Sequence, residues 1–167
     1  DRAKGGGNVS PMILERLSRE PYRLTMRRGS ARVGTVPDAV QVGPKVCLIN
    51  KYSASDGDLF PWGFHALGLG KLIGTRTWGG IIGISGSLPY MDGTDIRVPF
   101  FTSYDPKTGS WIVENHGVDP DILIDNDPIK EWNGEDQQLN RAIEEVMKEL
   151  QNRKPLPGIP APRDFSK

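Results

Sequence analysis

Hydrophobic positions along the chain fall into short runs that are separated by glycine- and proline-rich turns. Residues 46–50 form an apolar run without alternation, which is typical of a strand covered on both faces. Across residues 59–69, large apolar side chains recur at spacings of four and three, which predicts an amphipathic helix that ends at Gly70. Residues 72–75 predict the next strand. The chain therefore contains a predicted strand–helix–strand unit, and the polar turn at residues 53–58 enters its helix.

The segment before this unit contains one predicted helix. Ser10 is expected to cap it and Pro11 to occupy its first position, and the helix is expected to end before Pro21. Residues 22–45 are basic and show no clear period, so they predict an irregular connection with one edge strand. Their arginines are expected to be solvated, with substrate contact as the alternative.

The segment after the unit alternates short strands with turns. A glycine-rich loop at residues 77–80 precedes a predicted strand at residues 81–84. Residues 95–104 and 111–113 predict two further strands, joined by a hairpin connection at residues 105–109.

The last part of the chain predicts one long helix and a tail. Residues 122–124 predict a short strand after a turn, and residues 136–152 predict the helix. One face of this helix is apolar and is expected to lie in the core or at an interface; it comprises Leu139, Ile143, Val146, Met147 and Leu150. We expect an α/β domain over residues 1–152 and a proline-rich extended tail over residues 153–167.

Composition and charge narrow the class of protein. Of the 167 residues, 37% are apolar and 25% are charged, with 21 acidic and 21 basic side chains, so nothing favours a nucleic-acid or membrane-surface partner. No apolar stretch approaches the roughly 20 residues of a membrane span. The single cysteine, Cys47, lies in an apolar run and predicts a buried structural thiol. We expect neither a metal nor a cofactor. The chain opens without a methionine or a signal peptide, so we expect a piece of a longer polypeptide.

The first segment with possible chemistry is the turn at Ser55. A serine is a useful nucleophile only when it is exposed beside a base and near donors for a developing oxyanion, and a strand-to-helix turn supplies exposure and backbone N–H groups. The alternative is that Ser53, Ser55 and Asp56 only cap the following helix.

Two further segments could complete such a site. The glycine run at residues 5–7 permits the backbone geometry of an oxyanion hole, although a flexible loop or a phosphate cradle would need the same residues. Glu114 follows a predicted strand and could orient a base, or could be a satisfied surface acid. His116 could join Ser55 and Glu114 in a triad, but its position two residues from Glu114 makes this the less favoured arrangement, and His65 is expected to be structural.

Together these segments resemble the tricorn type of the tail-specific (S41) serine peptidases. Four matching pieces occur in the family's order, at residues 2–10, 53–60, 73–80 and 113–121. The resemblance implies a crotonase-like (ClpP-like) α/β spiral core with a β-hairpin and a C-terminal helix, of which residues 1–152 would be the C-terminal part. It implies peptide hydrolysis through an acyl-enzyme.

The resemblance also assigns roles to single residues. Ser55 matches the nucleophile. The amide of Asp56 and an amide of the glycine run, Gly6 or Gly7 with Gly7 preferred, match the oxyanion hole. Glu114 matches the acid that acts through a serine on the base histidine.

This sequence also departs from the family in places. Tail-specific relatives carry a lysine base where this sequence has Gly80, which excludes the serine–lysine mechanism. Lys4 stands where the family usually has an asparagine. The family's serine–histidine pair and a PDZ-like domain are expected upstream of Asp1.

The expected substrate is a peptide or an unfolded protein segment. The expected assembly is a homo-oligomer in the cytoplasm, with an exported or periplasmic protein as the alternative. Two other functions stay open: a peptidase fold that has lost catalysis and serves binding or assembly, and a crotonase-type acyl-CoA enzyme.

Overall fold

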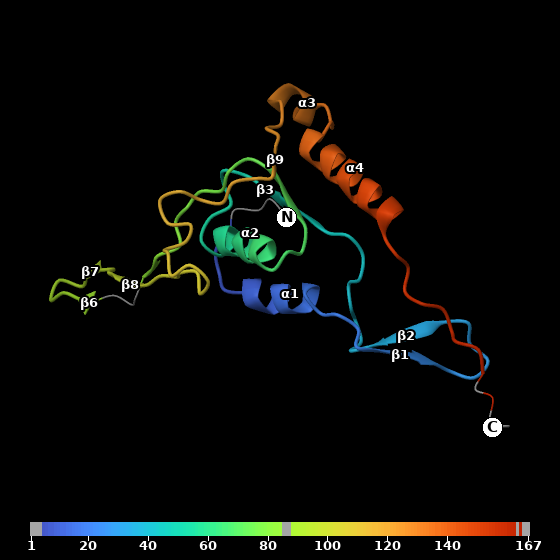
Figure 1. The fold of residues 1–167 in the computed structure, drawn as a ribbon. Helices are drawn as coiled ribbons and strands as arrows, with labels where there is room; N and C mark the ends of the chain where they lie inside the picture. The colour runs from blue at the N-terminus through green and yellow to red at the C-terminus, as the bar shows by residue number, and fades with distance from the viewer. Residues whose placement is uncertain (1–4, 85–87, 163, 165–167) are drawn as a thin grey trace.

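A three-stranded parallel sheet lies at the centre of the molecule (Figure 1). The computed structural model describes residues 5–84, 88–162 and 164. The sheet comprises β3 (Val46–Ile49), β4 (Lys71–Gly74) and β9 (Ile122–Leu123) in the order β3-β4-β9. Parallel neighbours require a crossover, and helix α2 (Asp56–Ala66) makes the crossover from β3 to β4. The predicted strand–helix–strand unit is therefore confirmed.

Helices cover both faces of this sheet, as the apolar run of β3 predicts. Cys47 and Ile49 of β3 are buried in one core cluster with Phe64 of α2 and Leu72 of β4. Ile73, the residue after Leu72, is completely buried and points to the opposite face, because alternate side chains of a strand face opposite sides. Helix α4 (Gln137–Asn152) packs against β3 and β4. The α/β class is confirmed by this layering.

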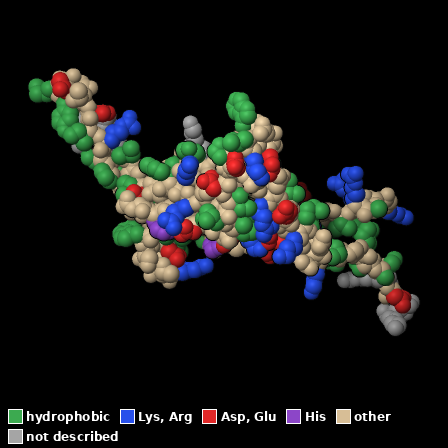
Figure 2. Space-filling view, turned by 90° about the horizontal axis from the view of Figure 1, so that it is seen from above, with side chains coloured by type: hydrophobic (Ala, Val, Ile, Leu, Met, Phe, Trp, Pro, Cys, Tyr) green, Lys and Arg blue, Asp and Glu red, His purple; other side chains and the backbone are tan. Residues whose placement is uncertain are grey.

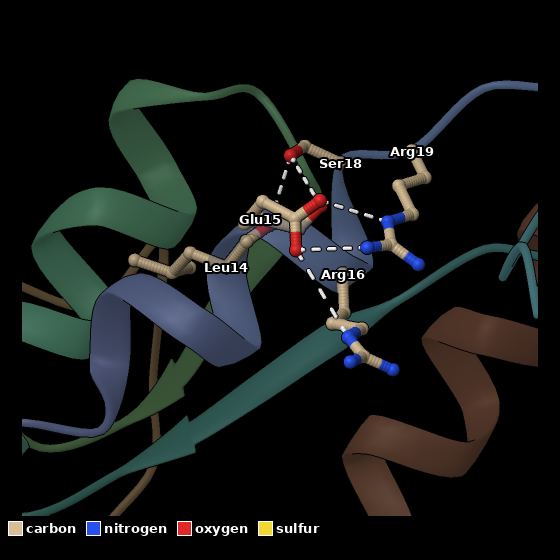
Figure 3. A network of polar contacts seen from close by, with 5 residues as sticks. All are labelled: Leu14, Glu15, Arg16, Ser18 and Arg19. Carbon is tan, nitrogen blue, oxygen red and sulfur yellow. Dashed lines mark hydrogen bonds and ion pairs between the residues drawn. The ribbon is translucent and has the colours of Figure 1, made fainter.

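Helix α1 (Ser10–Leu17) packs on α2 on the outer side of that first layer (Figure 1). The packing is close: a Cβ at Gly63 of α2 would come within 2.5 Å of the Leu14 side chain. At the end of α1, the Ser18 hydroxyl donates to the Leu14 carbonyl, and Arg19 makes two hydrogen bonds to Glu15 (Figure 3). Glu15 and Arg19 lie at the surface, where such pairs add only about 0.3–0.5 kcal/mol.

The start of α2 differs from the prediction. The helix begins at Asp56 and ends at Ala66, whereas the apolar pattern predicts residues 59–69. Its first turn carries Asp56 and Asp58, which are buried yet polar, so the apolar period does not reach the true beginning of the helix.

The basic segment 22–45 contains more order than predicted. β1 (Arg23–Met26) and β2 (Val33–Val36) form a two-stranded antiparallel hairpin, so the expected single edge strand is wrong. Most of its residues are exposed, so it has no buried face that would show as a period in the sequence.

A narrow ribbon extends from the body on the side opposite this hairpin, and we call it the arm (residues 83–84 and 88–101; Figure 1). β5 (Gly83–Ile84) pairs with β8 (Pro99–Phe101), and β6 (Leu88–Pro89) pairs with β7 (Asp95–Ile96). The predicted strand 95–104 is therefore two short strands. The predicted strand 111–113 is wrong, because only a single bridge between Tyr104 and Trp111 remains around the turn at residues 105–109.

The C-terminal part keeps the predicted long helix. α4 begins one residue after Asp136, whose side chain caps it, and the preceding short helix α3 (Pro128–Trp132) was not predicted. Residues 153–162 form neither helix nor strand and run beside β1 and β2 (Figure 1). Residues 163 and 165–167 of the predicted tail lie outside the described residues, and the division of the chain at residue 152 stays a prediction. None of the helices that the structure describes is long and apolar enough to cross a membrane.

The apolar face of α4 is not the face that meets the sheet. The buried residues of α4 are Gln138, Ala142 and Glu145, whereas the predicted core positions Leu139, Ile143, Met147 and Leu150 are each more than 40% exposed. Of the two alternatives for this face, the core is wrong within the described residues, because the sheet side of α4 is held by polar contacts, and the interface stays a prediction. Glu145 pairs with Lys71 and Arg141, and Gln138 donates to the Ile124 carbonyl.

Candidate active site

Ser55 occupies the last position before α2, in a backbone conformation that is unusual for a residue with a side chain. Its φ is +57° and its ψ is −116°. Such conformations cost about 1–3 kcal/mol and cluster at functional sites. Its side chain makes no capping hydrogen bond to α2, so the alternative in which Ser55 only caps the helix is not what the structure shows. The turn is held by the backbone instead, with the Ser55 amide donating to the Gly80 carbonyl at 3.1 Å.

The amide N–H of Asp56 is the first donor of α2. The next amides of the turn have acceptors, since Gly57 donates to the Ala54 carbonyl and Asp58 to the Ser55 carbonyl. The Asp56 N–H has no acceptor among the described residues. Unsatisfied N–H groups at the start of a helix are suited to a negative oxygen. This donor directly follows Ser55, as an oxyanion hole requires.

The glycine run lies against the same turn. A Cβ on Gly5 would come within 1.9 Å of the Ala54 carbonyl oxygen, and one on Gly57 would come within 2.8 Å of the Gly5 Cα. Gly6 and Gly7 have φ values of +110° and +101° and no other atom near the position of a Cβ. The structure therefore brings the glycine run and the Ser55 turn together, although they are about 50 residues apart in the sequence.

The Asp56 side chain ties α1 to this turn. Its Oδ2 accepts hydrogen bonds from the amides of Val9 at 2.9 Å and Ser10 at 3.1 Å. The helix cap is Val9, so the prediction that Ser10 is the N-cap is wrong by one residue. The Ser10 hydroxyl donates instead to the Asp56 carbonyl. Capping of α2 and an oxyanion-hole amide were the roles expected of Asp56 from the sequence, whereas the hydrogen bonds of its side chain to α1 were not predicted.

Asp58 holds the glycine-rich loop at residues 77–80. Its side chain is completely buried, and its two oxygens accept hydrogen bonds from the amides of Gly79 at 2.8 Å and Gly80 at 3.3 Å. Because the Gly80 carbonyl accepts from the Ser55 amide, Asp58 supports the Ser55 turn through this loop. This role was not predicted from the sequence; the available signal was a pair of aspartates in the first turn of a helix.

Glu114 lies on a tight turn on the other side of the loop. Its Oε2 accepts hydrogen bonds from the amides of Ile81 at 2.7 Å and Ile82 at 3.0 Å. The turn is attached to the loop by a hydrogen bond from the Asn115 amide to the Gly79 carbonyl. The structure therefore places Glu114 on the loop that supports Ser55, and no hydrogen bond joins it to Ser55 among the described residues.

Both histidines have carboxylate partners away from the Ser55 turn. His65 lies 3.4 Å from Asp121, and His116 lies 3.7 Å from Asp119, with both imidazoles largely exposed. The other ring nitrogen of His116 contacts the Gly117 carbonyl. The structure therefore does not bring His116 into a triad with Glu114 and Ser55, in agreement with the ranking from the sequence.

The Trp78 indole occupies the space beside Gly80, the position at which tail-specific relatives are expected to carry a lysine base. A Cβ on Gly80 would come within 2.1 Å of the Trp78 indole, so a side chain there would displace the indole. A glycine at this place leaves no amine to act as the base.

A cleft of about 490 Å³ opens beside the turn. Gly5, Gly6, Ser53 and Asp56 line its polar side, and Val9, Ile13 and Phe60 line its apolar side. Cys47 also lines it, but burial raises the pKa of the Cys47 thiol to about 11, so this thiol stays protonated at neutral pH and is a poor nucleophile. No group of side chains suited to hold a metal ion occurs in the part of the chain that the structure describes.

The fold defines an α/β protein in which a serine at a positive φ directly precedes the first amide of a helix. Comparison with known proteins identifies the class more closely, because residues 2–124 match peptidase family S41. The chain belongs to this family.

Two of the similar proteins are tricorn proteases. The chain is 42% identical over 156 residues to a tricorn protease of Thermoplasma volcanium, and the match covers 92% of this chain and 15% of that relative. It superimposes on the crystal structure of the tricorn protease with a TM-score of 0.79 at 40% identity, covering 89% of this chain and 14% of the other. The chain thus spans about one seventh of the length of these relatives.

A photosystem II D1 C-terminal processing protease shares the fold alone. Its TM-score is 0.52 at 22% identity, and the match covers 72% of this chain and 32% of the other.

Proposed function

We propose that this chain carries the nucleophile and the oxyanion hole of a tricorn-type serine peptidase. The observation that carries the proposal is the turn itself: Ser55 is held at a positive φ, directly before an amide that has no acceptor among the described residues. The glycine run lies against this turn, and the family is S41. Each feature alone has a structural alternative, but their combination is that of an acyl-transfer site.

In the proposed reaction, the Ser55 hydroxyl oxygen attacks the carbonyl carbon of a peptide bond. The amides of Asp56 and of Gly6 or Gly7 stabilise the oxyanion, and each such donor is worth about 10²–10³ in rate. The base takes the Ser55 proton and gives it to the leaving amine as the C–N bond breaks. Water then attacks the ester, and Ser55 recovers its proton.

A histidine from outside the described residues is the proposed base. The two histidines of this chain support this, since each is paired with an aspartate away from the Ser55 turn. Glu114 is proposed to complete the site through a serine–histidine pair, without contact to Ser55. The proposed substrates are peptides or unfolded segments, and the proposed assembly is a homo-oligomer.

The test is active-site labelling of the full-length gene product with a fluorophosphonate, followed by peptide mapping. We expect the label on Ser55. The Ser55→Ala variant should lose both the label and peptide hydrolysis, while Ser103→Ala, a change at a serine outside the turn, should retain them. If Ser55→Ala hydrolyses peptides as fast as the wild type, the proposal is wrong.

A further inference from the structure

The Asp56 carboxylate is a buried charge that the proposed chemistry does not use. The residue is only 7% exposed, and its own backbone amide is the one that is proposed to bind the oxyanion. The carboxylate accepts from two amides of a segment 46 and 47 residues earlier in the chain. A buried charge that holds two backbone amides fixes their positions, because losing it would leave the amides without an acceptor.

These contacts join the two halves of the proposed oxyanion hole. One half is the Asp56 amide and the other is the glycine run, which is separated from Val9 only by Asn8. The Oδ2 atom holds the amides of Val9 and Ser10, and the Ser10 hydroxyl returns a hydrogen bond of 3.1 Å to the Asp56 carbonyl. Three hydrogen bonds therefore join Asp56 to Val9 and Ser10, the segment that directly follows the glycine run and Asn8.

This connection matters for Gly6 and Gly7, because it is Gly5, within the glycine run, that packs against the backbone of Ala54 and Gly57. Glycine loses more conformational freedom on folding than any other residue, and no atom of the described residues beyond the chain neighbours lies within 4 Å of a Cβ position at Gly6 or Gly7. An oxyanion hole works only when its donors are fixed before the charge develops. The negative charge of Asp56 also lies at the N-terminus of α1, where the helix dipole favours it.

We propose that the Asp56 carboxylate is a positioning residue that holds the glycine-run amides in register with the Asp56 amide, which rests on the proposed function of the Ser55 turn. Asp56 thus has two separate roles in the proposed site. Its amide binds the oxyanion, and its side chain fixes the distance to the second donor.

The test separates the side chain from the amide, because every variant at this position keeps the backbone N–H. In the full-length gene product, Asp56→Ala should lower kcat for a peptide substrate by about 30–100-fold and leave KM within about threefold, since misplacing a catalytic group by about 1 Å can cost 10²-fold. Asp56→Asn keeps an oxygen acceptor and should stay within about fivefold of the wild type. Ser10→Ala, which removes one of the three bonds, should lie between the two.

A transition-state probe distinguishes positioning from general loss of structure. A peptide aldehyde forms a tetrahedral adduct whose oxygen occupies the oxyanion hole, whereas the corresponding peptide alcohol does not. Asp56→Ala should weaken aldehyde binding in proportion to its loss of kcat/KM and leave alcohol binding within about twofold. The control is Asp127→Ala at the start of α3, where an aspartate likewise accepts from two amides, Ile129 and Lys130, away from the site. It should change none of these quantities.

The possible results separate this inference from the function on which it rests. If the wild type fails to label at Ser55, the proposed function and this inference are both wrong. If the wild type labels and Asp56→Ala binds the aldehyde as well as the wild type does, only the inference is wrong. Should Asp56→Ala fail to fold, Asp56→Leu decides, because leucine is of similar size but has no acceptor for the Val9 and Ser10 amides. A loss of aldehyde affinity beyond about tenfold with unchanged alcohol binding would support the inference, and aldehyde affinity equal to that of the wild type would overturn it.

Discussion

At the scale of single residues, the site depends on carboxylates that hold backbone rather than substrate. Asp56, Asp58 and Glu114 each accept two amide hydrogen bonds from a segment distant in sequence. Loops near a reaction centre have few apolar contacts to fix them, and charge-assisted hydrogen bonds are about twice as strong as neutral ones. The glycine-rich loops are therefore held in place by hydrogen bonds from nearby backbone amides to side-chain carboxylates.

Gly79 shows how closely these loops pack. Its φ is +87°, and a Cβ there would come within 2.5 Å of the Gly117 amide nitrogen. We expect Gly79→Ala to lower the free energy of unfolding by about 3 kcal/mol or more, because the strain of a positive φ is added to a backbone clash. Urea denaturation measures this quantity.

Gly134 is the matched control. Its φ is +86°, and no other atom lies within 4 Å of a Cβ there. Gly134→Ala should therefore lose only about 1–2 kcal/mol. Equal losses for the two substitutions would contradict the close packing of the loop.

Cys47 makes stability depend on alkaline pH. Burial raises the pKa of its thiol from 9.0 to about 11, so the unfolded chain releases this proton at lower pH than the folded chain does. The contribution is fully present below pH 9 and is lost as the pH rises toward 11, by about 2–3 kcal/mol in total. Cys47→Ala should flatten the fall in stability between pH 9 and 11, as measured by urea denaturation at each pH. An unchanged slope would contradict this role of the thiol.

Much of the candidate site could be predicted from the sequence at this scale. The contacts that could not be predicted join residues that are far apart in the chain. Ser55, Asp56 and the glycine run were found because a strand-to-helix turn and a glycine cluster are visible in the sequence and because they match the family pattern. The side-chain contacts of Asp56 and Asp58 join residues that are 21 to 47 positions apart. No local pattern in the sequence records such a pairing.

At the scale of elements, α4 attaches to the sheet through charge as well as packing. Glu145 is buried and is held by Lys71 of β4 and by Arg141 of its own helix. The hydrogen bond from Lys71 lowers the pKa of Glu145, and the same bond raises the pKa of Lys71. This arrangement explains why the predicted apolar face of α4 does not face the sheet.

The pair predicts a dependence of α4 on acidic pH. Because the folded-state pKa of Glu145 is lowered, its contribution is present above about pH 4.5 and is lost as the pH falls through the lowered value. Glu145→Gln should reduce stability at pH 7 and should flatten the loss of stability below pH 4.5. Hydrogen exchange in α4 at pH 7 and pH 4 measures both effects.

Glu144→Gln provides the neighbouring control. The Glu144 side chain is 70% exposed and contacts only Arg141 at 3.7 Å among the described residues, so its substitution should change little. If the two substitutions had the same effect, the attachment of α4 would not depend on the buried pair.

Elements were predictable where apolar side chains gather in a run or a stripe and not where they are scattered. The strands of the central sheet were found from apolar runs, and the two longest helices were found from the spacing of apolar side chains, although the apolar stripe of α4 is exposed in the structure. The hairpin of β1 and β2 and the strand pairings of the arm were missed or misplaced. Their residues are mostly exposed, so pairing of the backbone alone defines them.

At the scale of the whole molecule, a packed body carries two thin extensions. The arm leaves on one side, and the β1–β2 hairpin with residues 153–162 leaves on the other (Figure 1). Figure 2 shows hydrophobic side chains along the arm, where Met91, Phe100 and Phe101 are exposed. Among the described residues, the strands of the arm pair mainly with one another: β5 with β8 and β6 with β7.

The molecule should therefore open in a definite order. Segments with few buried contacts open at a low free-energy cost, whereas the strands of the core open only with global unfolding. Limited chymotrypsin treatment of this chain should cut first in the arm, at Tyr90, Met91, Phe100 or Phe101, and mass spectrometry of the fragments should locate these cuts. Phe64, which is buried at 2% exposure, should resist until the body unfolds.

The ratio of the two cleavage rates measures the difference in stability between arm and body. In urea below the global transition, arm cleavage should change little, because the arm is already open to the protease, while cleavage at Phe64 should accelerate as the body begins to unfold. Arm cleavage that waits for the global transition would contradict this order, since it would require the arm and the body to unfold as one unit. The arm begins next to Ile82, whose amide donates a hydrogen bond to Glu114. If the arm opens alone, this hydrogen bond between Ile82 and Glu114 should persist after the arm is cut.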